Sequence, residues 1–201
     1  MINLGISDIS VTMVGVLILA YIIGSVPFGL MIAKFKNVNI RASGSGNIGA
    51  TNVCRAMGWS YGILTLLLDV GKGVLATEIG LYFIESPWGH MAVGLMAVVG
   101  HSVSFLARFR GGKGVATALG VLLALAPDVC VLVFCFGSVL IKITRYVSPA
   151  TLLCSILVPI LLFIRDYPVA YVIVHAAIAF IIIIRHRSNI GRLLRGTENR
   201  I

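Results

Sequence analysis

The sequence predicts an all-α, polytopic integral membrane protein, built as a single membrane-embedded domain over residues 1–201. Two observations carry this prediction. Apolar residues make up 59% of the 201 positions and charged residues only 11%, against roughly 25% charged residues in soluble domains. Long charge-free runs also recur along the whole chain. A soluble domain of this length cannot bury so much apolar surface, whereas lipid covers the outside of a membrane protein.

Seven apolar stretches are candidate spans, because each crossing needs roughly 20 apolar residues. The first is long and uncharged and has no basic segment before it, which favours a spanning helix over a cleaved signal peptide. The second contains Asp69, Lys72 and Glu78 within its apolar run. In chain order the stretches are Ile9–Ala33, Ser60–Ile84, Ser86–Ala107, Gly114–Pro127, Val129–Ile141, Tyr146–Ile164 and Tyr167–Ile184.

The distribution of basic residues decides how the two short stretches, Gly114–Pro127 and Val129–Ile141, are counted. Each spans only about 20 Å as a helix, so one long helix and six spans are the alternative. With seven spans and the N-terminus outside, 14 of the 16 basic residues lie on the cytoplasmic side, whereas six spans divide them 8 inside and 7 outside. The positive-inside rule therefore favours seven transmembrane helices with a cytoplasmic C-terminus. The net charge of +9 then reflects membrane topology, and no nucleic-acid partner is expected.

The first predicted cytoplasmic loop combines glycines, neutral polar residues and two arginines. Glycines let backbone amides approach a ligand closely and form an anion-binding nest, and the polar side chains add donors. A flexible helix connector is the alternative, but a connector seldom needs this density of donors. We expect a phosphate-type anion site formed by Arg41, Gly44, Ser45, Gly46, Asn47, Gly49, Thr51, Asn52 and Arg55.

The second loop places one charged residue, Lys113, among Gly111, Gly112 and Gly114. The phosphate-loop pattern GxxxxGK[ST] is absent, so the motif alone is a weak signal. It faces the same side as the first loop, which favours phosphate binding. The alternative is a helix start with a lysine that extends to the membrane surface.

The third segment is the basic tail from Arg185. His186 and Asn189 are three residues apart and share one face of a helix, so they can point into a site together; a headgroup anchor is the alternative. Glu198 is the only carboxylate in a predicted cytoplasmic loop. Magnesium sites in phosphate chemistry normally use one or two carboxylates, so we expect protein cations to hold the phosphate, with no metal and no cofactor.

The sequence leaves the role of one buried charged pair open, and it gives the four cysteines no chemical role. Asp69 and Lys72 can pair on one helix face, as a structural ion pair or as part of a functional site, and His101 can approach the Lys113 loop. The cysteines are expected to be small core or lipid-facing residues without a redox or zinc role; they are Cys54, Cys130, Cys135 and Cys154.

The motifs, taken together, resemble the bacterial acyl-phosphate:glycerol-3-phosphate acyltransferases, the PlsY family. They include the GSGNIGATNV run from Gly44, GGKGVATALGV from Gly111 and RHRSNIGRLLRGTE from Arg185. The resemblance implies a seven-helix enzyme of the bacterial inner membrane whose active site faces the cytoplasm. It implies transfer of a fatty acyl group from acyl phosphate to the 1-hydroxyl of glycerol-3-phosphate, giving lysophosphatidic acid and phosphate, the first acylation step of phospholipid synthesis.

The resemblance also implies residue roles. Ser45, Asn47, Thr51 and Arg55 match the phosphate pocket, and Lys113 matches a lysine that contacts substrate phosphate. His186 and Asn189 match site residues of the tail, and Ser148 and Thr151 are a further match. We expect direct attack of the substrate hydroxyl on the acyl carbonyl, with His186 or a substrate phosphate oxygen as base and Asn189 or backbone amides holding the oxyanion.

Two other classes of function remain open at this point. A phosphate-ester transporter would also use basic loops, but transporters commonly carry internal repeats and a midplane site, and no convincing repeat is present. A non-catalytic lipid-binding scaffold would need the basic tail but not the polar donors of the first loop. Membrane lipids are expected partners of all three classes.

Overall fold

The computed structural model describes residues 11–201, and every regular element in that range is a helix. The first two residues of the predicted span Ile9–Ala33 lie outside the described residues. The α-helices are α1 (Val11–Ser25), α2 (Phe28–Phe35), α3 (Ala50–Met57), α4 (Trp59–Phe83), α5 (Pro87–Ser102), α6 (Val115–Leu125), α7 (Pro127–Thr144), α8 (Val147–Ile164), α9 (Val169–Arg185) and α10 (Arg187–Leu194). Short 3₁₀ turns η1 (Ile40–Ala42) and η2 (Phe105–Ala107) lie in two of the loops.

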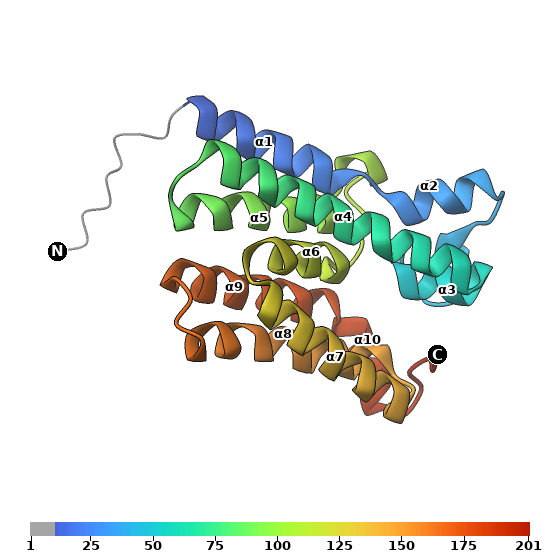
Figure 1. The fold of residues 1–201 in the computed structure, drawn as a ribbon. Coiled ribbons are helices and arrows are strands. Elements are labelled where there is room, and N and C mark those ends of the chain that lie inside the picture. Colours follow the sequence, from blue (N-terminus) through green and yellow to red (C-terminus); the bar gives the residue numbers. More distant parts are fainter. Residues whose placement is uncertain (1–10) are drawn as a thin grey trace.

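The helices form two layers with α6 between them (Figure 1). Helices α1, α4 and α5 pack together in one layer, and α7, α8 and α9 in the other. Helix α6 contacts α4 and α5 on one side and α7 on the other. This central helix has only 11 residues, and it ends where Ala126 turns the chain before Pro127 starts α7. The alternative of one long helix over residues 114–141 is therefore excluded.

The break between α1 and α2 falls at Pro27, inside the first predicted span. Proline has no backbone N–H, and it disfavours helical backbone in the residue before it. Val26 accordingly lies outside both helices, and its carbonyl accepts a hydrogen bond from Lys72 Nζ at 2.7 Å. The break thus exposes a backbone acceptor that a buried lysine of α4 uses.

Glycine allows α4 and α6 to approach each other closely. A methyl group on Gly73 would overlap the carbonyl oxygen of Thr117, and one on Gly120 would overlap that of Val70. Small residues at helix contacts are the usual means of close packing in membrane bundles, where dispersion contacts stabilise the interface. This contact fixes α6, and with it the loop that carries Lys113, against α4.

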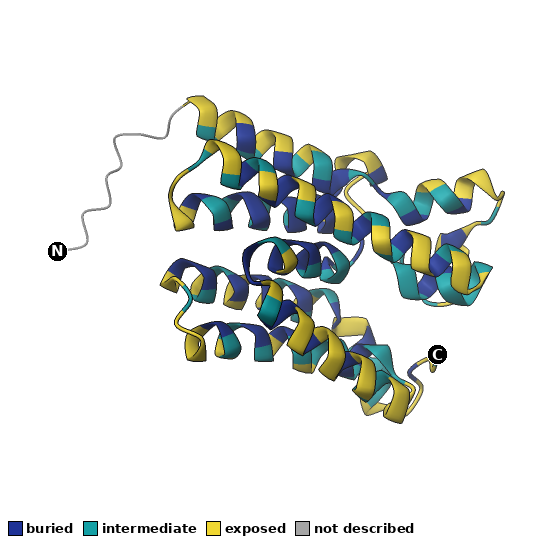
Figure 2. Ribbon diagram, in the orientation of Figure 1, coloured by how far each residue is buried: buried dark blue, intermediate teal, exposed yellow. Residues whose placement is uncertain are grey.

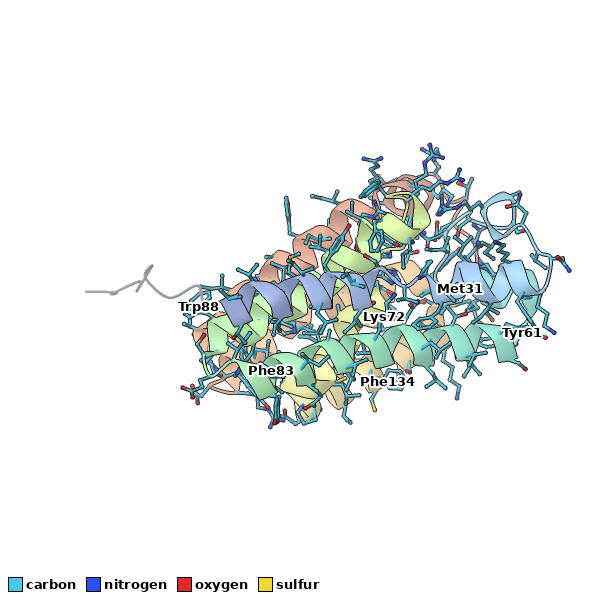
Figure 3. The ribbon with its side chains drawn as sticks, turned by 90° about the horizontal axis from the view of Figure 1, so that it is seen from above. Met31, Tyr61, Lys72, Phe83, Trp88 and Phe134 are labelled. Carbon is cyan, nitrogen blue, oxygen red and sulfur yellow. The ribbon has the colours of Figure 1, made fainter. Side chains whose placement is uncertain are left out.

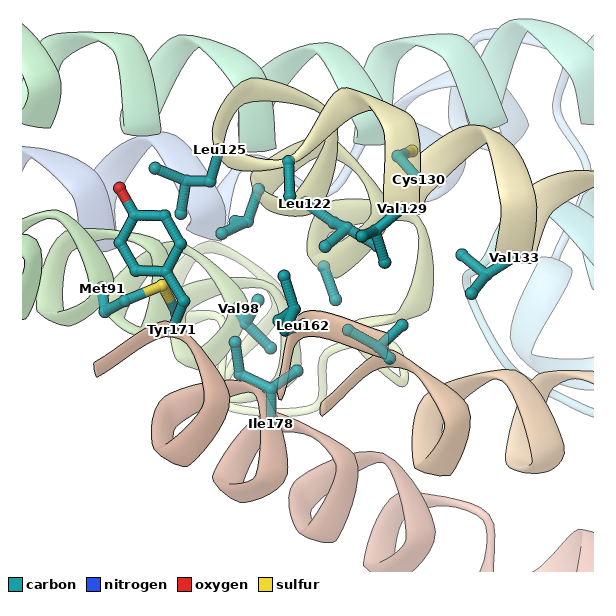
Figure 4. Close-up of a cluster of buried hydrophobic side chains, with 14 of the residues drawn as sticks. Met91, Val98, Leu122, Leu125, Val129, Cys130, Val133, Leu162, Tyr171 and Ile178 are labelled. Atoms are coloured by element: carbon teal, nitrogen blue, oxygen red, sulfur yellow. The ribbon is translucent and has the colours of Figure 1, made fainter. Parts of the chain in front are cut away.

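The main apolar core lies between α6 and the helices around it (Figure 4). Met91 of α5, Leu122 of α6, Leu162 of α8 and Ile178 of α9 are each at most 2% exposed. Figure 2 shows the buried positions turned toward the centre and the exposed ones toward the outside. Dispersion contacts among such closely packed side chains are individually small but large in sum, so this cluster joins the two layers.

The outer surface is apolar as well. Leu67, Phe163 and Phe180 expose between 62% and 73% of their surface, as expected of side chains that face lipid. Four helical stretches are long and apolar enough to cross a membrane, and α9 with the bent α10 makes a possible fifth. The four are Val11–Phe35, Pro87–Ala107, Pro127–Thr144 and Val147–Ile164. Helix α6 is shorter, and α4, with 25 residues, carries three charged side chains.

All three basic motifs lie at one end of the bundle. Helices α3 and α10 and the C-terminus lie together there, opposite the start of α1 (Figure 1). At the other end, Arg165 pairs with Asp128 at 3.2 Å, and Tyr167 donates to the same carboxylate at 2.6 Å. The fold therefore gathers loops that are far apart in sequence.

Candidate functional site

A cavity of about 810 Å³ lies at the basic end of the bundle. It is lined by residues from the first loop, the Lys113 loop, the start of α8 and the tail. Twelve of the predicted site residues line it: Ser45, Asn47, Gly49, Thr51, Asn52, Arg55, Lys113, Gly114, Ser148, Thr151, His186 and Asn189. The structure thus brings together residues from four separate parts of the chain.

Asn52 organises the first loop. Its Oδ1 accepts from the Ser45 amide at 2.8 Å, and its Nδ2 donates to the carbonyls of Ile40, Ser43 and Asn47. The side chain is 2% exposed, so its hydrogen-bonding groups are occupied by the loop itself. The sequence pattern indicated Asn52 as a donor to an anion; in the structure it shapes the loop whose other groups face the cavity.

Five predicted site residues do not line the cavity: Arg41, Gly44, Gly46, Gly111 and Gly112. Gly44 and Gly46 have φ of +55° and +69°, a backbone conformation that glycine adopts without strain. The Arg41 guanidinium donates to the carbonyl of Arg110 at 2.8 Å, which ties the first loop to the second. These residues hold the two loops in place.

Arg185 and His101 hold the Lys113 loop through hydrogen bonds to its backbone. Arg185 donates to the carbonyls of Gly111 and Gly112 at 3.0 and 3.1 Å, and the Gly112 amide donates to the carbonyl of His101 at 3.1 Å. The predicted approach of His101 to this loop is confirmed. With the backbone fixed in this way, the side chain of Lys113 is directed into the cavity.

Lys113 meets the tail at the cavity wall, where its Nζ donates to Asn189 Oδ1 at 2.6 Å. Burial lowers the pKa of Lys113 from 10.5 to about 8; Glu198 opposes this shift, while Arg192, Arg55 and Arg185 add to it. A pKa this low means that the surrounding groups do not fully stabilise the positive charge of the ammonium. It is therefore ready to pair with an incoming anion.

A pH dependence of anion binding follows from this pKa. Lys113 loses its proton as the pH rises through about 8, so the affinity of the cavity for inorganic phosphate should fall about tenfold from pH 7 to pH 9. Calorimetric titration of the protein in detergent measures the phosphate affinity at each pH. Lys113→Arg keeps its charge over this range and controls for the titration of phosphate itself. Equal pH profiles for wild type and variant would contradict the prediction.

Glu198 is the residue that joins the tail to α8. It is 7% exposed, and its Oε1 accepts from Ser148 at 2.7 Å and from Asn189 Nδ2 at 2.6 Å. Its Oε2 accepts from Arg192 at 2.7 Å. Sequence analysis singled out Glu198 only as a lone carboxylate and missed this role; its position as the one acidic residue in a basic tail was the available signal.

Arg55 has unused hydrogen-bonding capacity beside the cavity. Its Nη2 donates to the Asn199 carbonyl at 2.9 Å, while its buried Nε has no hydrogen-bond partner within residues 11–201. Burial lowers the pKa of this guanidinium, although arginine stays charged in proteins. A buried cation with a spare donor favours an anionic ligand.

His186 presents an acceptor nitrogen to the cavity. Its Nδ1 lies 2.8 Å from the carbonyl oxygen of Ile182, and a carbonyl can only accept a hydrogen bond. Nδ1 therefore carries the proton, and Nε2 of the neutral ring has a free lone pair. His186 and Asn189 both line the cavity, although His186 lies at the break between α9 and α10 and not within one helix with Asn189.

The cavity also has an apolar wall. Trp59, Ile63 and Leu66 of α4 and Phe134 and Ile141 of α7 form it. Asp69 and His101 lie at the cavity as well. The site therefore combines cations with a surface suited to a hydrocarbon chain.

Cys54 differs from its predicted place, because it lines the cavity instead of facing core or lipid. Burial raises the pKa of its thiol, and Arg55 offsets only part of this shift. The thiol is therefore protonated near neutral pH and is a poor nucleophile. In the described part of the chain, no group of three His, Cys, Asp or Glu side chains is placed to hold a metal ion.

Comparison with known proteins gives a consistent result. The family described as glycerol-3-phosphate acyltransferase matches residues 14–196. The glycerol-3-phosphate acyltransferase of Aquifex aeolicus is 44% identical over 185 residues, covering 91% of this chain and 96% of the relative. That of Thermus thermophilus is 43% identical over 185 residues, covering 92% and 93%.

Two crystal structures of PlsY (YgiH), an integral membrane glycerol 3-phosphate acyltransferase, share this fold. The glycerol 3-phosphate form has a TM-score of 0.90 at 43% identity, covering 94% of this chain and 95% of the other. The lysophosphatidic acid form has a TM-score of 0.88 at 42% identity with the same coverage.

Proposed function

Because the chain belongs to the glycerol-3-phosphate acyltransferase family, we propose that this membrane acyltransferase uses acyl phosphate as its donor. The acyl group moves to the 1-hydroxyl of glycerol-3-phosphate, and the products are lysophosphatidic acid and inorganic phosphate. This reaction is the first acylation step of phospholipid synthesis. The observation that carries the proposal is the cavity that combines Lys113 and Arg55 with an apolar wall.

The two substrates match the two kinds of surface in the cavity. Both carry a phosphate, and Ser45, Thr51, Arg55 and Lys113 supply hydroxyl and cationic donors for it. Phosphate binding by charge-assisted hydrogen bonds is strong. The acyl chain lies along the wall between α4 and α7, close to lipid, so that it need not cross a polar region to reach the site.

Catalysis then rests mainly on positioning and on charge stabilisation. The hydroxyl oxygen attacks the acyl carbonyl, the carbon–oxygen bond to phosphate breaks, and phosphate leaves with the bond's electrons. The hydroxyl proton goes to His186 Nε2 or to a phosphate oxygen. Lys113 can stabilise the developing oxyanion and the leaving phosphate. Both N–H groups of Asn189 are taken by Ser148 and Glu198, so Asn189 instead positions Lys113, whose Nζ donates to its Oδ1 at 2.6 Å.

Direct transfer is favoured over an acyl-enzyme intermediate. Cys54 lines the cavity but has a raised pKa, and the Ser148 hydroxyl donates to Glu198 while its oxygen accepts from Asn189 at 2.8 Å. A hydroxyl engaged in this way lacks the adjacent histidine base that activates a serine nucleophile.

The proposed topology has seven transmembrane helices in the bacterial inner membrane, with the N-terminus outside and the C-terminus in the cytoplasm. In this topology, α4, α6 and α9 cross the membrane in addition to the four long apolar stretches. The basic loops at one end of the bundle (Figure 1) support a cytoplasmic site under the positive-inside rule. Helix α6 crosses a locally thinned region or extends through its flanks.

The donor is tested by comparing three acyl donors in one assay. Purified protein in detergent receives labelled glycerol-3-phosphate with acyl phosphate, acyl-CoA or acyl carrier protein of the same chain length. Of the three donors, only acyl phosphate is expected to give lysophosphatidic acid. Product from either thioester at a comparable rate would overturn the donor assignment.

Removal of divalent metals is expected to leave the reaction unchanged, because protein cations hold both phosphates. Initial rates with excess EDTA should equal those without it. A loss of activity that magnesium restores would contradict this expectation and would require a metal at the phosphates.

A further inference from the structure

A buried chain of contacts leads from the α1–α2 break to the cavity. Lys72 Nζ donates to the Val26 carbonyl at 2.7 Å and pairs with Asp69 Oδ1 at 2.7 Å. The same carboxylate oxygen lies 3.6 Å from His101 Nδ1. Lys72, Asp69 and His101 are each at most 5% exposed, and Figure 3 places Lys72 between α4 and the N-terminal helices.

His101 connects this chain to the loop that carries Lys113. Its carbonyl accepts from the Gly112 amide at 3.1 Å. Its ring lies so close to Gly112 that a methyl group there would overlap Nε2. The position of the His101 ring thus sets the position of the backbone one residue before Lys113.

Asp69 and His101 line the cavity, whereas Lys72 does not. The carboxylate is therefore placed between a lysine behind it and a histidine at the cavity wall. A buried ion pair that only stabilised α4 would gain little over apolar side chains of the same size. A site for phosphates would also be weakened by an unneutralised carboxylate, which Lys72 prevents.

We propose that Asp69 is a positioning residue for the acyl transfer: it orients His101 against Gly112 and so holds Lys113 at the substrate phosphate. Lys72 neutralises Asp69 and anchors it to the α1–α2 break. The inference rests on the proposed function, which it deepens. A displacement of about 1 Å at a reacting group can lower a rate about 100-fold, so loss of this support should be measurable.

The test removes both charges of the pair together. Asp69→Asn alone would leave Lys72 unpaired in the bundle, which is expensive, whereas Asp69→Asn with Lys72→Met keeps the interior neutral. Glu78→Gln is the matched control, because Glu78 is an exposed carboxylate on the same helix. For each protein, kcat and KM for glycerol-3-phosphate, calorimetric affinity for inorganic phosphate and thermal unfolding are measured.

The double variant is expected to unfold near the wild-type temperature, yet to lose phosphate affinity and about 100-fold in kcat/KM, mostly through KM. Glu78→Gln should match wild type. A folded double variant with wild-type phosphate affinity and KM would overturn the proposal.

Should the double variant fail to fold, His101→Asn gives the answer. It removes the ring that packs on Gly112 and should weaken phosphate binding; unchanged binding would refute the positioning role. If wild type binds phosphate but makes no lysophosphatidic acid, the proposed function fails instead, and the phosphate affinities still decide the role of Asp69.

Discussion

Substitution of Lys113 by alanine is expected to lower kcat/KM for acyl transfer by about 10²–10³-fold, the range observed when one preorganised donor to a developing charge is removed. The ammonium lies in a partly buried site and donates to Asn189 Oδ1 at 2.6 Å. Its loss removes a charge that pairs with substrate phosphate and leaves the Asn189 oxygen without this donor. The measurement is the initial rate of lysophosphatidic acid formation at varied glycerol-3-phosphate.

The matched control is Lys34→Ala, because Lys34 is an exposed lysine of the same basic end. It should leave the rate within about twofold, since exposed charges contribute little. Near-normal turnover in folded Lys113→Ala would remove Lys113 from the phosphate site.

Substitution of Glu198 by alanine is expected to give the second large effect, in both stability and activity. The carboxylate accepts from Ser148, Asn189 and Arg192, so its loss leaves three donors unsatisfied at the cavity. Breaking a buried pair costs about 3–5 kcal/mol; the Arg192 side chain is 24% exposed, so the lower end of this range, or somewhat less, is expected. Thermal unfolding in detergent measures the change.

Activity of Glu198→Ala should fall with stability, because Asn189 loses the partner that directs its amide. Glu85→Ala, at an exposed carboxylate in the α4–α5 connection, is the control and should alter neither quantity. An unchanged unfolding temperature in Glu198→Ala would show that the buried network does not hold the tail.

Most of the fold could be predicted from the positions of charged residues. Charge-free runs mark the helices, and the basic loops between them fall at one end of the bundle (Figure 1). The break at Pro27 was not predicted from the absence of charge between Ile9 and Ala33, although a proline inside an apolar run is itself a signal for such a break. The separation of α6 from α7 was predicted only from the number of basic residues that each topology places on the two sides of the membrane.

The candidate site was predicted in composition but not in its internal contacts. Local patterns identified Ser45, Arg55 and Lys113, because glycine-rich basic loops are conspicuous in an apolar chain. The partners of Asn52 and Glu198 depend on which helices approach one another, which no local spacing encodes. Arg41 likewise binds a carbonyl of another loop, and its charge alone did not distinguish that contact from a ligand contact.

The most direct test of direct acyl transfer is the molar ratio of the two products. Purified protein receives acyl phosphate and labelled glycerol-3-phosphate, and phosphate and lysophosphatidic acid are quantified from the first turnover onward. Direct transfer predicts equal amounts at every time, with phosphate release dependent on glycerol-3-phosphate. Phosphate released in a burst before lysophosphatidic acid forms, or released without it, would contradict direct transfer.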